Sequence, residues 1–120
     1  MKANELQIGD WVANPLGWRA KVQSIKYLND NYRIRIGLND DSYQDYLSSE
    51  EIFPIPLTAE ILEKNFPDPT DGLTWFPEEG GFNCHTYVPK CEINAFGLFK
   101  YVHQLQNALR LCGIEKGIEL

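Results

Sequence analysis

The 120-residue sequence is short of basic residues, with 11 lysines and arginines against 17 aspartates and glutamates and a net charge of −6. A chain this acidic is not expected to be a strongly basic nucleic-acid-binding protein. Its three cysteines, Cys84, Cys91 and Cys112, are too few for a disulfide-held fold. No run approaches the roughly 18 apolar residues of a membrane helix, and the first ten residues contain no secretory-type apolar segment. We expect a cytoplasmic protein with reduced thiols and no membrane contact.

The composition is otherwise that of an ordinary globular chain, with 43% apolar, 12% aromatic and 23% charged residues. This excludes generic disorder and a coiled coil, and the length fits one domain or two very small ones. The only candidate boundary is Leu57-Thr58, which separates an all-β part (1–57) from an α+β part (58–120). Because no flexible linker joins them, the second part is expected to pack on the first, as two parts or one continuous domain.

Alternating apolar and polar residues predict a series of short strands in the first half. Pro54 and Pro56 place the last strand at an edge of the sheet. Ser48 and Glu51 form the pattern of a capping box, with room for one helical turn before that strand. The predicted strands are 10–13, 18–28, 32–38, 43–47 and 52–56.

The second strand predicts a β-bulge, because its alternation changes phase at Ser24-Ile25. Ile25 and Tyr27 must then share a face with the apolar residues of the next strand. An even-numbered loop achieves this by pairing Tyr27 with either Ile34 or Tyr32, whereas a three-residue loop would turn an arginine into the core.

The second half predicts a short helix over 59–65 with Thr58 as its N-cap, then strands over 73–76, 82–88 and 91–93. Leu98 begins a series of apolar residues at helical spacing that ends at Cys112. The predicted fold class is α+β: an N-terminal SH3-like small β-barrel, a short helix, a small antiparallel sheet and an amphipathic C-terminal helix. The predicted core consists of Trp11, Val12, Val22, Ile25, Tyr27, Ile34, Ile36, Ile52, Ile55, Leu62, Val102, Leu105 and Leu109.

No motif indicates an enzyme, and no cofactor is expected. The cysteines and the two histidines, His85 and His103, lack the paired spacing of a zinc site, so no metal is expected either. A cysteine nucleophile paired with a histidine through the tertiary fold stays open as a third hypothesis. The adjacent acidic residues, such as Glu78-Glu79, lie in predicted turns and read as solvated side chains.

Charge is unevenly distributed in the first half. Five bases stand on the second and third strands with only Asp30 among them, whereas the acids gather in 39–51. The outward face of this hairpin should therefore be basic, and Trp18, Tyr27 and Tyr32 should point inward. The five bases, which could bind a nucleic acid, are Arg19, Lys21, Lys26, Arg33 and Arg35.

His103, Asn107 and Arg110 recur at spacings that place them on one polar face of the last helix. With Arg33 and Arg35, we expect His103 and Asn107 to be exposed binding residues for another protein. The leading hypothesis is a non-catalytic protein-interaction module that uses loops and open edges. The alternative is a nucleic-acid-associated accessory protein that uses the basic hairpin. The partner's identity and the oligomeric state stay open.

Three segments in this order, 4–12, 52–62 and 100–107, resemble a family of small uncharacterised proteins encoded by phages, prophages and mobile elements of gut bacteria. The string Tyr-Val-His-Gln-Leu-Gln-Asn, at 101–107, is the most specific mark. Residues 66–97 match weakly, and the end of the helix, 108–113, departs from the family's aromatic-rich run. The resemblance implies a mobile-element context and an accessory role, without a catalytic residue.

Overall fold

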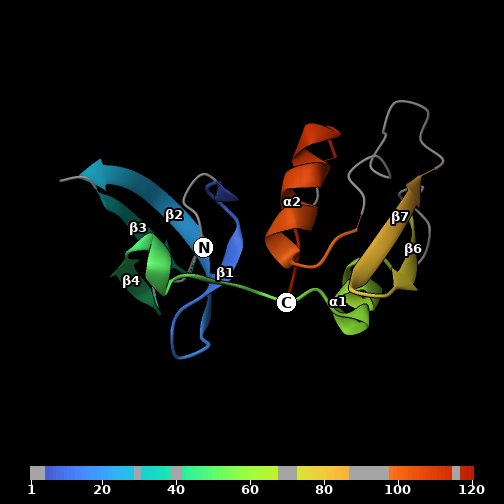
Figure 1. The fold of residues 1–120 in the computed structure, drawn as a ribbon, viewed down its shortest axis with the longest axis horizontal. Helices are drawn as coiled ribbons and strands as arrows, with labels where there is room; N and C mark the ends of the chain where they lie inside the picture. Colours follow the sequence, from blue (N-terminus) through green and yellow to red (C-terminus); the bar gives the residue numbers. More distant parts are fainter. Residues whose placement is uncertain (1–4, 29–30, 39–41, 68–72, 87–97, 115–116) are drawn as a thin grey trace. The chain divides into compact units, whose positions relative to one another are not determined.

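A computed structural model describes residues 5–28, 31–38, 42–67, 73–86, 98–114 and 117–120 (Figure 1). The chain forms two compact units, Met1–Ile55 and Pro56–Leu120. The architecture is α+β, with a curled five-stranded antiparallel sheet in the first unit and a two-stranded sheet with two helices in the second.

The sheet of the first unit has the order β4-β3-β2-β1-β5. It is a meander whose last strand returns to pair with the first, and its 3-10 turn, η2 (Ser49–Glu51), precedes that strand. In η2, Glu51 accepts a hydrogen bond from the backbone N–H of Ser48 at 3.1 Å, as the capping-box pattern predicted. The strands are β1 (Trp11–Ala13), β2 (Arg19–Leu28), β3 (Asn31–Gly37), β4 (Gln44–Leu47) and β5 (Phe53–Pro54).

The core of this unit lies on one face of the sheet and is aliphatic. Its buried members are Leu6, Val12, Ala20, Val22, Ile34, Ile36, Leu47 and Ile52. Burying these side chains supplies most of the driving force for folding, at about 25 cal/mol for each Å² of apolar surface removed from water. Trp11 and Ile25, which the sequence placed in the core, are only half-buried.

The register of the β2–β3 hairpin confirms the even-loop prediction, since Tyr27 pairs with Tyr32 and Ile25 with Ile34. The bulge occurs between Val22 and Ser24, slightly before the predicted position. One extra residue shifts the pleat by one position, so Val22 and Ile25 point to the same core face on either side of it.

The prediction that Trp18, Tyr27 and Tyr32 are turned into the core is wrong. They are 59%, 59% and 42% exposed, although Tyr27 and Tyr32 share the core face with Ile25 and Ile34. For the two tyrosines the reason is the length of the hairpin: β1 pairs only with Arg19–Lys21 and β4 only as far as Ile34, so the far end of the hairpin is a two-stranded ribbon (Figure 1). Tyr27 and Tyr32 pack on each other there, 5.0 Å between ring centroids.

The turn between β1 and β2 is fixed by the buried side chain of Asn14. Its Oδ1 accepts hydrogen bonds from the backbone N–H groups of Leu16 and Trp18, both at 2.9 Å, and its amide donates to the Tyr43 hydroxyl at 2.8 Å. Gly17 closes the turn with a φ of 84°, a conformation that suits glycine. Burial raises the pKa of the Tyr43 phenol, and its protonated hydroxyl donates a hydrogen bond to the Asp45 carboxylate at 3.3 Å.

The second unit contains α1 (Ala59–Asn65), the hairpin β6 (Leu73–Glu78) and β7 (Gly81–Thr86), and α2 (Val102–Leu111). Thr58 caps α1 as predicted, its hydroxyl accepting from the Ile61 amide at 3.2 Å. Asn65 holds the end of the chain, because it exchanges two 2.7 Å hydrogen bonds with the backbone of Glu119. The predicted strand 91–93 lies outside the described residues. No helix among the described residues has the length and apolarity to cross a membrane.

The apolar series from Leu98 predicted an earlier helix start than the structure shows. Before α2 begins, Phe99 forms an isolated β-bridge with Phe82, and Tyr101 forms one with Pro56. These backbone pairings require extended conformation, so Leu98 precedes the helix. Tyr101 is the N-cap residue, and its backbone N–H donates to the Gln104 side chain at 3.2 Å.

Gly37 is needed where β3 passes the bulge. A Cβ atom there would lie 2.8 Å from the carbonyl oxygen of Tyr43 and 2.8 Å from the Gln23 side-chain amide. We therefore expect Gly37→Ala to destabilise the first unit by about 1–3 kcal/mol, because the added methyl meets a fixed backbone atom. Urea denaturation checks this, with Gly117→Ala as the control, since no atom lies within 4 Å of a Cβ there. Equal stability of both variants would contradict the expectation.

Candidate functional site

The strand register places all five predicted basic residues on one side of the sheet, opposite the core. We call this side the outer face. Because side chains alternate along a strand, Lys21 and Ser24 face outward on either side of the bulge, and Arg33 and Arg35 do so on β3. The outer face consists of Trp11, Ala13, Arg19, Lys21, Ser24, Lys26, Arg33, Arg35, Gly37, Gln44, Tyr46 and Phe53.

Three aromatic residues share this face with the bases. Tyr46 pairs directly with Arg35, so their side chains are neighbours on one row across the sheet. Trp11 pairs with Lys21, and the Lys21 ammonium lies 5.1 Å from the centre of the Trp11 ring, within cation–π range. Phe53 lies on β5, next to Ala13, in the same row as Arg19. Each of these three rows therefore combines one ring with one positive charge.

The bases are not neutralised within the described part of the chain. No carboxylate among the described residues forms an ion pair with any of the five. Lys26 and Arg33 stand directly opposite each other, a like-charged pair that disfavours the hairpin. The Nε of Arg35 is shielded from solvent, and among the described residues it has no hydrogen-bond acceptor. This face retains positive charge at some cost in stability.

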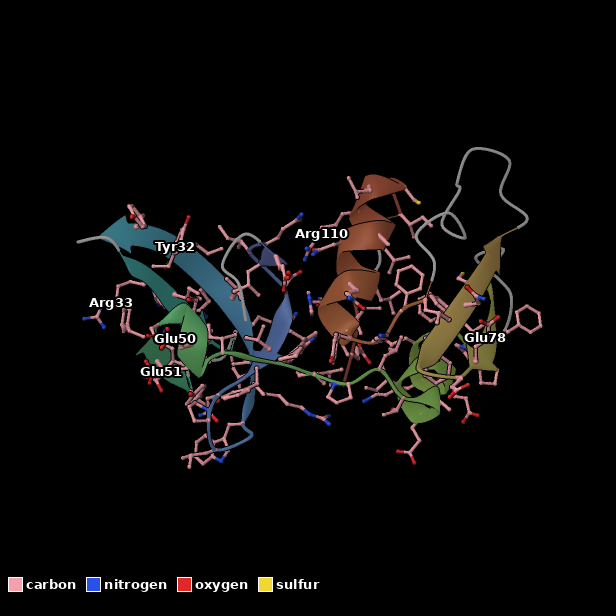
Figure 2. All side chains as sticks on the ribbon, in the orientation of Figure 1. Tyr32, Arg33, Glu50, Glu51, Glu78 and Arg110 are labelled. Atoms are coloured by element: carbon pink, nitrogen blue, oxygen red, sulfur yellow. The ribbon has the colours of Figure 1, made fainter. Side chains whose placement is uncertain are left out.

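The strand positions of the outer face include no acidic residue. Asp45 stands on β4 but faces the core side, where it accepts the Tyr43 hydroxyl hydrogen bond. Glu50 and Glu51 belong to η2, and Figure 2 shows them on that turn, with Arg33 on β3. The separation of signs that the sequence suggested thus occurs between the strands and the turn that follows β4.

Of the four residues predicted to form an exposed protein-binding surface, not all are exposed. Arg33 is exposed and Arg35 half-buried. The prediction that His103 is exposed is wrong: it is 5% exposed and stacks on Tyr101 with 5.9 Å between ring centroids. The buried side of α2 is wider than a simple apolar stripe, because it also includes Gln106 and Ala108.

Asn107, the fourth predicted residue, is half-buried and accepts a 2.8 Å hydrogen bond from Arg110. Its side chain thus has a partner within its own helix, one turn away. Arg110 is exposed, and Figure 2 shows it on α2. Within the second unit, Arg110 is thus the exposed member of the polar series His103, Asn107 and Arg110.

The sequence did not single out Tyr46 and Phe53, which are 60% and 49% exposed on the outer face. A usable signal existed in the alternation. Tyr46 stands between Asp45 and the core residue Leu47, and Phe53 follows the core residue Ile52, so each is one pleat position away from a core side chain.

The described residues contain no candidate metal site. Among them, no group of three or more histidine, cysteine or acidic side chains is arranged to hold a metal ion. Cys84 is buried on β7 opposite Trp75, and Cys112 is half-buried at the end of α2. Cys91 and the side chain of His85 lie outside the described residues, so a cysteine–histidine pair stays a prediction.

The opposed pair Lys26 and Arg33 generates a stability prediction. We expect Lys26→Glu to stabilise the hairpin by about 0.2–1 kcal/mol, because it replaces repulsion by attraction. Amide hydrogen exchange of Ile25 and Ile34 would slow accordingly. Arg19→Glu serves as the control, since Arg19 stands opposite the uncharged Ala13. Faster exchange in Lys26→Glu than in the unaltered protein would show that the pair does not repel.

No family model, no curated protein and no solved structure matches this chain. What the protein does is therefore inferred from its own surface. The outer face, with three rings and five bases that form no ion pair with another described residue, is the candidate functional site.

Proposed function

We propose that the protein is a non-catalytic, nucleic-acid-associated accessory protein that binds the phosphate backbone with the outer face of its first unit. One observation carries the proposal: five bases from β2 and β3 share a face on which the strands place no acidic residue. Lysine and arginine side chains bind phosphate through charge-assisted hydrogen bonds, and they release the counterions that surround a nucleic acid.

The net charge limits the affinity. The first unit has six bases and eight acids in residues 1–55, so the field at long range does not attract a polyanion. Because exposed charges are screened beyond a Debye length of about 8 Å at physiological salt, the five local bases dominate at contact. We expect binding in the range of non-specific complexes, with a dissociation constant of about 10⁻⁴–10⁻⁶ M.

The proposal includes a finer description of fold and context. The β1–β4 meander, the 3-10 turn and the return of β5 to β1 support an SH3-like arrangement of the first unit. An origin in a phage or mobile element rests on the sequence resemblance alone. An accessory protein of such an element would regularly meet nucleic acid.

Docking of an acidic protein on the same bases is the other hypothesis, since arginine and tyrosine are also enriched at protein interfaces. The burial of His103 removes part of the surface predicted for it. The repelling Lys26–Arg33 pair favours a ligand with closely spaced negative charges, which is the property of a phosphate backbone.

We expect the full chain to bind a labelled oligonucleotide with a strong salt dependence, measured by fluorescence anisotropy. Five phosphate contacts predict a slope of about −3.5 in log affinity against log salt for a single strand. The double variant Lys26→Gln with Arg33→Gln should reduce the magnitude of that slope by about 1.4, because two contacts are lost.

Lys100→Gln is the matched control, since it removes an exposed positive charge from the second unit and should leave the slope unchanged. Poly-glutamate is the competing probe for an acidic protein partner. Absence of oligonucleotide binding at low salt would contradict the proposal. Competition by poly-glutamate as strong as that by unlabelled oligonucleotide would instead favour the acidic-protein hypothesis.

A further inference from the structure

We infer that the outer face selects single-stranded over double-stranded nucleic acid, with Tyr46 and Phe53 as base-stacking platforms; this inference rests on the proposed function. Their exposed fractions of 60% and 49% leave ring surface open to a ligand. An exposed aromatic ring stacks on any unpaired base without sequence preference.

The arrangement of charge and rings follows the order of the strands. Bases occupy β2 and β3, in the interior of the sheet, whereas Tyr46 lies on one edge strand, β4, and Phe53 on the other, β5. At about 4.8 Å between neighbouring strands, β4 and β5 are about 19 Å apart along the sheet. A strand that crosses this face would place phosphates over the central bases and nucleobases on the rings at both edges.

Tyr46 and Phe53 each share a row with an arginine that can bind the phosphate next to a stacked nucleobase. Tyr46 is directly opposite Arg35, whose Nε has no acceptor among the described residues. Phe53 shares its row with Arg19, across Ala13. Trp11 differs from both, because the Lys21 ammonium already lies over its ring. Tyr46 and Phe53 are therefore the two rings available for stacking.

A duplex cannot use these rings, because its bases are stacked on each other and present only their edges in the grooves. It can use the phosphate contacts alone. A single strand gains both kinds of contact, since its bases are free to stack on aromatic side chains. The basic residues of the outer face thus account for binding to either form, and the two rings account for the preference for the single strand.

The test compares a labelled oligonucleotide of about 12 nucleotides, a length within the range of single-strand-binding domains, with its duplex by fluorescence anisotropy on the full chain. We expect the single strand to bind more tightly than the duplex. Tyr46→Ala and Phe53→Ala should each weaken single-strand binding by about fivefold or more, and leave duplex binding nearly unchanged.

Two further variants separate stacking from folding. Tyr46→Phe keeps the ring and should retain the preference for the single strand. Tyr32→Ala removes an exposed tyrosine from the opposite side of the sheet and should leave both affinities unchanged. Amide exchange of Ile34 and Ile36 verifies that each variant keeps the fold.

Equal affinity for both forms, unaffected by Tyr46→Ala and Phe53→Ala but still reduced by Lys26→Gln with Arg33→Gln, would overturn this inference and leave the proposed function standing. No binding of either form by the unaltered protein would overturn the proposed function itself. If Tyr32→Ala loses as much single-strand affinity as Tyr46→Ala, stacking is not specific to the outer face, and this inference is wrong.

Discussion

The register of the β2–β3 hairpin is the constraint on which the first unit depends. Side chains of a strand alternate between two faces, so a slip of one residue would exchange the core with the arginines. The bulge at Gln23 allows Val22 and Ile25 to face the same core although their separation along the chain is odd. The aliphatic core and the basic outer face are therefore two consequences of one pairing.

Two residues outside the core, Asn14 and Gly37, help to maintain this register. Asn14 ties the β1–β2 turn to Tyr43, and Gly37 admits the Gln23 side chain and the Tyr43 carbonyl close to β3. These contacts determine how β4 lies beside β3, and hence that Tyr46 stands next to Arg35. Part of the geometry of the candidate site is therefore set by residues other than its bases and rings.

The outer face also includes a like-charged pair that costs stability. The opposed charges of Lys26 and Arg33 reduce the stability of a ribbon that has no third strand beside it. Natural proteins tolerate such features where a ligand compensates for them, since selection acts on function as well as on stability. For a phosphate backbone, the closely spaced bases become an advantage.

Much of this could be predicted from the sequence, because its patterns are local. The alternation in β2 and β3, the phase slip near Ser24, the N-cap at Thr58 and the grouping of five bases each depend on residues a few positions apart. The predictions that failed concern which side chains are buried. Tyr27 has the correct face but lies beyond the reach of β1 and β4, and His103 occupies a polar position on a helix whose buried side is unusually wide.

Local patterns in the sequence were enough to predict the strands, the even-numbered hairpin loop and the basic outward face of the hairpin, since period-two alternation and loop parity are short-range properties. Which residues share a row and which are covered depended instead on how the strands pack in three dimensions. Tyr46 lies opposite Arg35 because β4 pairs with β3, and Phe53 lies in the row of Arg19 because β5 pairs with β1. The strands β1 and β5 are distant in the sequence. Such contacts depend on which strands pair with each other over long sequence separations, and a local sequence pattern does not contain that information.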